Sequence, residues 1–196
     1  MKRLLILGIV CLLSGCNDKS ADSAKPAVSG SARPAAAART GAAAQIVNGD
    51  FEQTASDGSI PGWDQVQHAG EKSYEMRIDA DGAYAGHGSF HMIRIKPQVY
   101  GSLTQNLDLR AYAGKTLELS AMLKSRDVGP DGWKLMVNGN VAGTLQYSPG
   151  LTGTTEWQRQ SVTLKLPPNS QRITIGVTLL DAGEGWADNI EAKILD

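Results

Sequence analysis

His87 and His91 are the first residues whose spacing suggests chemistry, because they lie four positions apart. On a helix, this spacing would let both imidazoles bind one zinc ion. The surrounding sequence is instead typical of a turn followed by a strand, where positions four apart are separated by about 13 Å, at ~3.3 Å per residue. We therefore expect His87 and His91 to be surface or edge residues that share no metal.

The sequence marks no catalytic nucleophile. It contains no Gly-x-Ser-x-Gly elbow, and its two cysteines are Cys11 and Cys16. Glycoside hydrolysis would need two carboxylates facing each other across a cleft, and no pair among the 20 acidic residues is marked by its surroundings. We interpret the following acids as turn residues: Asp79, Asp81, Asp127 and Asp131. The sequence therefore favours a protein that is not an enzyme, and a small glycoside-active enzyme is the least favoured alternative.

Aromatic residues beside loops suggest binding instead. A sugar presents apolar ring faces and hydroxyl edges, so its site combines an aromatic platform with polar side chains. Trp133 is the leading platform candidate, because it follows the loop Gly129-Pro130-Asp131-Gly132 and the strand period could leave it at a rim. The further candidates are Tyr100 and Tyr147 beside loops, with Gln105, Arg94, Arg126 and Lys124 as polar partners. The alternative for Gln105 is a buried amide satisfied by the backbone.

The first sixteen residues predict export and lipidation. Lys2 and Arg3 precede an apolar run over 4–13, which is too short to span a bilayer, since a helix needs about 20 residues. This pattern is typical of a secretory signal peptide. The ending Leu13-Ser14-Gly15-Cys16 has the form of a bacterial lipobox, which predicts cleavage before Cys16 and acylation of its thiol, for example with palmitate. The alternative is an ordinary signal peptide with a chance cysteine.

Three segments follow from this pattern. Residues 1–15 form the signal peptide, and residues 16–45 hold the lipidated cysteine and a disordered tether rich in Ala, Ser and Pro. Residues 46–196 are long enough for one domain with its own core. The lipid would anchor the protein in the cell envelope. The pair Asn17-Asp18 is not the strong form of an inner-membrane signal, which favours the outer membrane and its periplasmic face, while the inner membrane and the cell surface stay open.

Charge and cysteine content restrict the partners. Removal of Lys2 and Arg3 leaves 17 basic and 20 acidic residues, a net charge of about −3. No Lys/Arg cluster accompanies this balance, so nucleic acid is not an expected partner. Loss of Cys11 and lipidation of Cys16 would leave no disulfide, although the compartment would permit one. Stability must then come from a core, with a metal as a further contribution.

Apolar and polar residues alternate along most of the domain, which is typical of strands. The clearest runs cover residues 102–109, 116–124, 162–166 and 173–179, and further candidates are 74–78, 90–96, 133–137 and 186–195. Turn motifs bound these runs, including 128–132 and the Asn-Gly hairpin signal within 137–141. About eight to ten strands with one apolar face each predict an all-β fold, an antiparallel two-sheet β-sandwich of the jelly-roll class.

Several motifs, in order, resemble a known family. The segment 46–52 (Ile-Val-Asn-Gly-Asp-Phe-Glu), followed by Pro61-Gly62-Trp63, resembles the opening of carbohydrate-binding modules of families 4, 9 and 22, which are galactose-binding-like jelly rolls. The resemblance continues through 86–90, 103–109, 113–120, 156–158 and 186–190. It implies core packing for Trp157 and Trp186 at strand starts. One departure is Asn189, where the family more often has a second acid.

The resemblance also implies a metal. In such modules a structural calcium ion lies near the joined chain ends, bound by an acid of the opening motif, an acid of the closing strand and backbone carbonyls. The matching positions are Glu52 and Asp188. Two carboxylates brought close by an antiparallel pair would need a hard cation or hydrogen bonds to relieve their repulsion. The alternative is that both accept hydrogen bonds from nearby backbone.

These observations leave three functions in order of preference. The first is a non-catalytic, membrane-anchored protein of the bacterial envelope that binds a glycan or polysaccharide. The second is an envelope lipoprotein that binds another protein, as an assembly factor, part of an adhesin or a toxin inhibitor. The third is the small glycoside-active enzyme. An exposed strip of aromatics with amides would favour sugar, and a flat aliphatic patch, for example around Met122 and Met136, would favour protein.

Overall fold

A computed structural model describes residues 41–169 and 172–195 of the chain. The predicted signal peptide, Cys16 and most of the predicted tether lie outside these residues. The described part is all-β except for one 3-10 turn, η1 (Arg110–Tyr112). Among the described residues, no helix has the length and apolar character needed to cross a membrane.

Ten strands make up the described domain, and every pairing between them is antiparallel. They are β1 (Ala42–Ala44), β2 (Asp64–Gln67), β3 (Tyr74–Asp79), β4 (Ser89–Arg94), β5 (Gly101–Leu107), β6 (Thr116–Asn138), β7 (Leu145–Tyr147), β8 (Leu151–Lys165), β9 (Ile173–Leu179) and β10 (Glu184–Leu195). The hydrogen-bonded order is β2-β5-β9-β6-β10-β4-β3, with β7 and β8 paired to β6 and β1 paired to β10.

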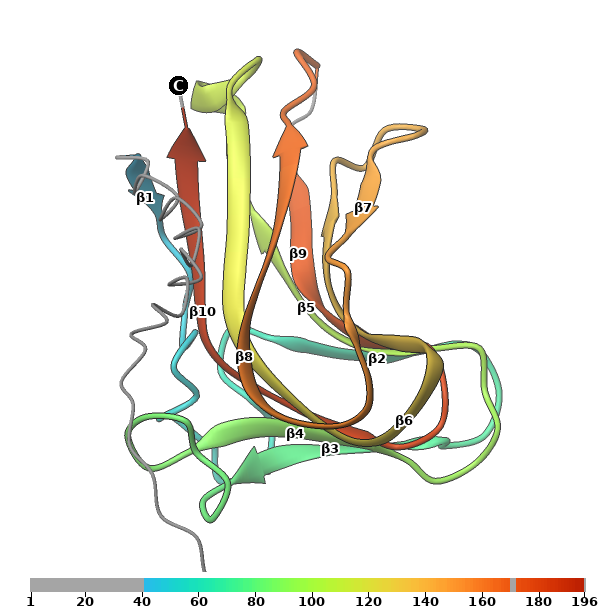
Figure 1. Cartoon of the computed structure of the whole chain (residues 1–196). Coiled ribbons are helices and arrows are strands. Elements are labelled where there is room, and N and C mark those ends of the chain that lie inside the picture. Colours follow the sequence, from blue (N-terminus) through green and yellow to red (C-terminus); the bar gives the residue numbers. More distant parts are fainter. Residues whose placement is uncertain (1–40, 170–171, 196) are drawn as a thin grey trace, which may run out of the picture. The chain divides into compact units, whose positions relative to one another are not determined.

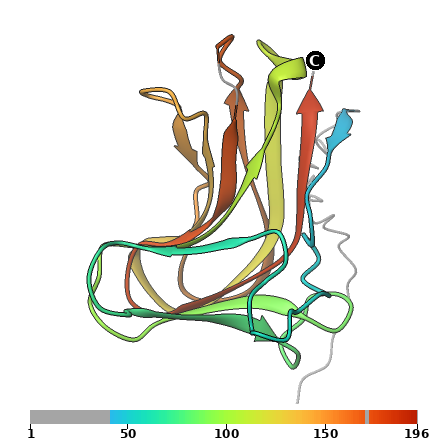
Figure 2. The same ribbon diagram turned by 180° about the vertical axis from the view of Figure 1, so that it is seen from behind.

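Strand β6 joins two sheets. Its first half lies between β8 and β10, whereas its second half lies between β9 and β7. We call the layer of β8, β6, β10, β4 and β3 the β3–β8 sheet, and the layer of β2, β5, β9, β6 and β7 the β2–β7 sheet. Figures 1 and 2 show β6, β8 and β10 curving strongly along their length. The predicted antiparallel jelly-roll sandwich is therefore confirmed.

The predicted turn over 128–132 is not a turn. The two strands expected at 116–124 and 133–137 are one strand, and 128–132 is the bend within it. Asp127 and Gly132 have φ angles of 53° and 87°, and the register with β8 shifts between Ser125 and Trp133. The backbone amide of Gly129 donates to the carbonyl of Ala182 (3.2 Å), which ties the bend to the loop between β9 and β10. The irregular residues bend β6, so that its second half pairs with β9 and β7.

The ordered domain begins inside the predicted tether. Residues Ala42–Ala44 of β1 pair with 192–194 of β10, so the sheet starts before the expected boundary at residue 46. The added Cβ of any larger residue at Gly41 would lie 2.3 Å from the carbonyl oxygen of Ile194, which shows how closely the two segments approach. Alanine-rich sequence carries little apolar pattern, and backbone pairing with β10 holds this strand together with the packing of Ala44 against the core.

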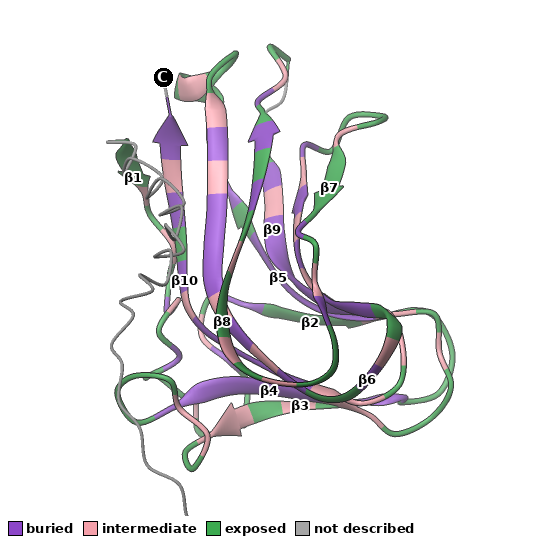
Figure 3. Cartoon of the chain, viewed as in Figure 1, coloured by how far each residue is buried: buried purple, intermediate pink, exposed green. Residues whose placement is uncertain are grey.

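One hydrophobic core lies between the sheets, and aromatic rings cross its middle. The ring centroid of Phe51 is 5.6 Å from that of Trp63 and 5.8 Å from that of Phe90, which stacks on Trp133 at 6.3 Å. Figure 3 shows the buried residues continuing along β4, β9 and β10. Each of these strands presents alternate residues to the core, as the period of two predicts.

Trp133 is in this core, so the prediction that it lies at a rim is wrong. Its side chain is fully buried, and its Nε1 donates to the backbone oxygen of Trp186 (3.0 Å). The bend before it sets the alternation so that Trp133, Leu135 and Val137 all face inward. The indole lies directly over Gly185, where an added Cβ would come within 2.5 Å of the ring. No ring face is left on which a sugar could stack.

We expect Trp133→Ala and Gly185→Ala both to destabilise the domain. Removing the indole should cost about 3–5 kcal/mol, and the added methyl should clash with it. Urea or thermal unfolding would measure the loss, with Leu145→Ala, an exposed position on β7, as the control. A change of less than about 1 kcal/mol in Trp133→Ala would contradict this packing.

Candidate functional site

A hollow of about 380 Å³ lies on the outward face of the β2–β7 sheet. Residues from five strands and their flanking turns line it: Val66, Tyr100, Ser102, Thr104, Met136, Asn138, Leu145, Tyr147, Thr174, Thr178 and Leu180. None of these eleven side chains is charged. The hollow is therefore a neutral surface with both apolar and hydrogen-bonding groups.

Strand alternation places these residues on one face. Ser102 and Thr104 of β5 point outward because Leu103 points into the core. The register brings Thr104, Gly176, Met136 and Tyr147 into one row across β5, β9, β6 and β7. Gly176 has no side chain, and a Cβ there would lie 2.0 Å from the carbonyl oxygen of Leu103. The surface of the sheet is therefore lowest at Gly176, in the middle of this row, and rises towards Tyr147.

Two of the binding candidates from the sequence, Tyr100 and Tyr147, border the hollow. Tyr147 is 41% exposed, and the Nζ of Lys134 lies 5.9 Å from its ring centroid. Tyr100 is half-buried, and His68 packs edge-on to it at 5.8 Å. Burial and the neighbouring Tyr100 raise the pKa of Tyr147, so its phenol stays neutral at ordinary pH. Both rings are held by neighbours, which limits the entropy that ligand contact would cost.

Hydroxyl and amide groups form the floor. The hydroxyl of Ser102 donates to that of Thr178 (2.9 Å), which in turn donates to the carbonyl of Gly101 (3.1 Å). At the other end, the hydroxyl of Thr174 donates to the side-chain oxygen of Asn106 (2.9 Å). These bonds fix the directions of the remaining lone pairs, as a preorganised polar surface requires.

Gln105 is not part of this floor. It points to the opposite side of β5, is 5% exposed, and exchanges hydrogen bonds with the amide and carbonyl of Val47 (2.9 and 3.0 Å). Its side-chain amide nitrogen, Nε2, also donates to the carbonyl of Gly62 (2.9 Å). The buried amide satisfied by backbone, which was the alternative for this residue, is what the structure shows.

The two arginine candidates lie elsewhere. Arg94 donates to the carbonyl of Gln98 (3.3 Å) and pairs with Asp181 (3.7 Å). Arg126 pairs with Glu184 and lies over the ring of Trp186, 5.3 Å from its centroid. Neither lines the hollow, because strand parity and the bend in β6 direct them away from it.

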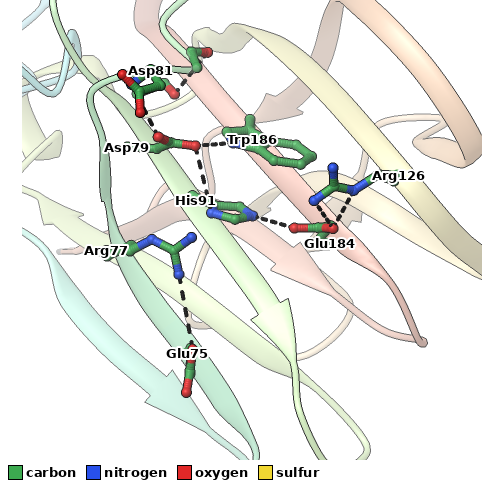
Figure 4. Close-up of polar contacts among 10 residues, drawn as sticks. Glu75, Arg77, Asp79, Asp81, His91, Arg126, Glu184 and Trp186 are labelled. Carbon is green, nitrogen blue, oxygen red and sulfur yellow. Dashed lines mark hydrogen bonds and ion pairs between the residues drawn. The ribbon is translucent and has the colours of Figure 1, made fainter.

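The outward face of the β3–β8 sheet carries a second polar cluster (Figure 4), which the sequence did not predict. His91 is 2% exposed, so the expectation of a surface or edge residue is wrong. Its ring stacks on Trp186 (4.2 Å, 6°) and its Nε2 lies 2.7 Å from a carboxylate oxygen of Glu184. Its Nδ1 has no hydrogen-bond partner and faces Asp79 at 3.8 Å. Asp79 itself accepts from the indole of Trp186 (2.8 Å).

The other tryptophans also differ from expectation. Trp186 is buried, but by His91, Lys124 and Arg126 on the outside of the sheet and not by the core. Trp157 is half-buried and packs against the exposed ring of Tyr84 at 5.7 Å. Core packing of these two residues, which the family resemblance implied, is therefore wrong. Strand alternation alone could not show which face of a strand is covered by a loop.

Burial lowers the pKa of His91 below its usual 6.5, although Glu184 and Asp79 favour the charged ring. The unfolded chain then binds a proton at higher pH than the folded chain does. We expect stability to be lost as the pH falls from about 6.5 through the lowered folded pKa. Thermal unfolding at pH 7.5 and 5.5 should show this loss in the wild type and a smaller one in His91→Gln. Equal losses of stability in the two proteins would contradict the assignment of this pH dependence to His91.

The predicted calcium ligands face N–H groups. Asp188 is fully buried and accepts from the amides of Tyr84 and Ala85 (both 3.0 Å) and of Asn189 (2.7 Å). Glu52 accepts from the amides of His87 (2.7 Å) and Gly88 (3.2 Å). Ca²⁺ needs six to eight oxygen ligands, whereas five backbone N–H groups already donate to these two carboxylates.

The hydrogen-bonded alternative accounts for the contacts that the structure shows for both carboxylates. Burial and the nearby Glu52 raise the pKa of Asp188, whereas the amides of His87 and Gly88 lower that of Glu52. Among the described residues, no group of three or more His, Cys, Asp or Glu side chains is placed to hold a metal ion. Calcium binding by Glu52 and Asp188 remains a prediction from the family resemblance.

A melting experiment decides between the two accounts. If the loop amides are the partners of Glu52 and Asp188, 5 mM Ca²⁺ should raise the melting temperature no more than 5 mM Mg²⁺ does. EDTA should then leave the melting temperature unchanged. Asp188→Ala should lower it, because three buried amides lose their acceptor. A rise in melting temperature that is specific to Ca²⁺ and that Asp188→Ala abolishes would support calcium binding at this site instead.

Comparison with known proteins gives the fold a context. No protein-family model matches the chain. The uncharacterised HTH-type transcriptional regulator YbfP of Bacillus subtilis (strain 168) is 29% identical over 132 residues, which is 63% of this chain. The chain spans less than half of that regulator's length (44%).

Solved structures share the fold at low identity. The module TmCBM61, in complex with β-1,4-galactotriose, is 19% identical with a TM-score of 0.54 over 77% of this chain and 98% of the module. A Stig cyclase of Fischerella sp. TAU is 14% identical with a TM-score of 0.58 over 79% of this chain and 98% of the cyclase. Carbohydrate-binding modules of families 4, 16 and 22 also share the architecture. The domain thus has a carbohydrate-binding-module fold, which also serves other functions.

Proposed function

We propose that this domain is a non-catalytic glycan-binding module and that the hollow on the β2–β7 sheet holds the sugar chain. The observation that carries the proposal is the pair Tyr100 and Tyr147 at the border of a neutral hollow whose floor is hydroxyls and amides. Aromatic rings match the apolar faces of sugars, and fixed hydroxyls and amides match their edges. The solved neighbours named for galactotriose and xylan binding support this class of ligand.

The lining argues against hydrolysis at this place. Cleavage of a glycosidic bond would need a carboxylic acid and a second carboxylate on either side of it. The lining residues of the hollow include neither. Asp79 and Glu184 lie on the other sheet, where Trp186, His91 and Arg126 engage them. A binding role therefore fits the described residues better than an enzymatic one.

We propose further that the chain is a lipoprotein. The lipobox ending at Cys16 and the Ala/Ser/Pro-rich segment after it support an acylated cysteine, a tether and a folded domain in that order. Acylation would place the module in the cell envelope, with the outer membrane and its periplasmic face favoured by Asn17. A lipid anchor would concentrate the module at a surface, where even modest affinity for a polymer becomes effective.

A protein partner is the second candidate, because apolar side chains also border the hollow. Val66 and Leu145 are 37% and 43% exposed, and Met136 lies between them in the lining. Exposed aliphatic residues in one patch are typical of protein contact sites. The absence of any charged lining residue fits either partner, so the binding experiment has to separate them.

A glycan array with residues 16–196 carrying Cys16→Ser tests the proposal. We expect saturable binding to one glycan class and at least a tenfold loss in Tyr147→Ala and Tyr100→Ala, about 1.4 kcal/mol each. Tyr84→Ala is the matched control, since this tyrosine is equally exposed but packs on the other sheet. A blank array with a folded protein, or equal loss in all three variants, would contradict the proposal. Crosslinking in intact envelopes would then test the protein partner.

A further inference from the structure

Lys134 lies directly beside the hollow on the β2–β7 sheet, although it is not one of the lining residues. In the second half of β6, Trp133 and Leu135 face the core, so Lys134 between them points outward. Its direct partner on β9 is Thr178, which belongs to the floor of the hollow. The Cβ atoms of directly paired residues lie about 5 Å apart. The side chain of Lys134 therefore starts at the edge of the floor.

Two glycines hold the stem of this lysine. Lys134 is half-buried. A Cβ added at Gly150 would lie 2.4 Å from its Cγ, and one added at Gly132 would lie 3.1 Å from its Cε. The far end of the stem leads to Tyr147, whose ring centroid is 5.9 Å from Nζ. The ammonium group is thus held near the hollow before any ligand arrives, so less side-chain entropy is lost on contact.

The ammonium group of Lys134 has no carboxylate beside it in the part of the chain that the structure describes. None of the ion pairs there, all within 4.0 Å, includes Lys134. Asp64 shares the outward face but lies on β2, three strands from β6, or about 14 Å at ~4.8 Å per strand. Asp181, which follows the lining residue Leu180, pairs with Arg94 (3.7 Å). A positive charge therefore borders the hollow without a neighbouring acid.

This charge favours one class of ligand over another. A neutral sugar chain would offer the ammonium group only hydroxyls, which replace water at little gain. A carboxylate or a sulfate ester on the unit above Thr178 would pair with it, and hydrogen bonds to ionised groups are the stronger ones. The oxygen of Ser102, whose hydroxyl donates to Thr178 (2.9 Å), keeps lone pairs with which to position a hydroxyl of the same unit.

We propose that the glycan bound in the hollow carries an anionic group, a carboxylate or a sulfate ester, on the unit above Thr178, and that Lys134 binds this group. The proposal rests on the proposed function, because the hollow has to hold the sugar chain itself. Lys134 is then the residue that determines specificity for charged glycans, whereas Tyr100 and Tyr147 supply affinity for the sugar rings.

Matched oligosaccharides test the proposal on residues 16–196 carrying Cys16→Ser. The probes are β-1,4-xylohexaose with and without a glucuronic acid branch, which tests a carboxylate, and β-1,4-galactotriose with and without a 6-sulfate. At low salt, the anionic form of at least one pair should bind about tenfold more tightly than its neutral form, and 0.5 M NaCl should reduce this ratio. Lys134→Met, which keeps an apolar stem between the glycines, should bring the ratio close to one. Lys134→Arg should retain most of it, because the charge remains.

Lys165→Gln is the matched control, because Lys165 is an exposed lysine at the end of β8, on the other sheet. It should keep the wild-type ratio. Equal affinity of the wild type for both forms of each pair, or an unchanged ratio in Lys134→Met, would overturn the proposal on Lys134 and leave the proposed function standing. Loss of both kinds of binding in Tyr147→Ala would support the shared site, whereas no binding of any probe by the folded wild type would overturn both proposals.

Discussion

The structure depends on one strand that serves two sheets. Strand β6 holds β8 and β10 with its first half and β9 and β7 with its second, so its bend fixes how the layers face each other. Trp133 follows that bend and lies on Gly185, with its indole nitrogen bonded to the neighbouring carbonyl of Trp186. A β-strand has only two faces, and the bend decides which residues of the second half face the core.

The outward faces of the two sheets therefore differ in how far side chains cover them. On the β3–β8 sheet, Trp186 is covered by His91, Lys124 and Arg126, and the loop carrying Tyr84 is tied down by Asp188. On the β2–β7 sheet, small residues at the centre, Gly176 and the Ser102–Thr178 pair, leave a hollow between taller side chains. The first face is closed by its own contacts, and the second is the one that we propose accepts a ligand.

Alternating apolar residues made most strands predictable, including the β5 and β9 runs that form the floor of the hollow. Tyr100 and Tyr147 could be found because aromatic residues at strand ends tend to border open surfaces. Trp133 could not, since its parity depends on the irregular residues Asp127 and Gly132, and one residue of register reverses the face. Gln105 was a binding candidate with a buried amide as the alternative, and its partners Val47 and Gly62 come from a distant segment that no local pattern could indicate.

Local sequence patterns could not predict the hydrogen-bond partners that distant loops contribute. The amides of Tyr84, Ala85, His87 and Gly88 donate to Glu52 and Asp188, and no local pattern predicts that a loop will supply these donors. A second hollow is lined by Asp108, Arg110, Asn140 and Arg172, whose proximity follows only from strand register. Sequence periodicity predicts elements well, whereas sites built across elements need the topology.

Chemical-shift mapping tests the central claim, that the outward face of the β2–β7 sheet binds the glycan, most directly. A ¹⁵N-labelled module titrated with an array-positive oligosaccharide should show its largest amide shifts in β5, β9 and β7, around Ser102, Thr178 and Tyr147. The amides of β3, β4 and β10 should stay in place. Shifts centred on Tyr84 and Trp157 instead would place the ligand on the β3–β8 sheet and contradict the account.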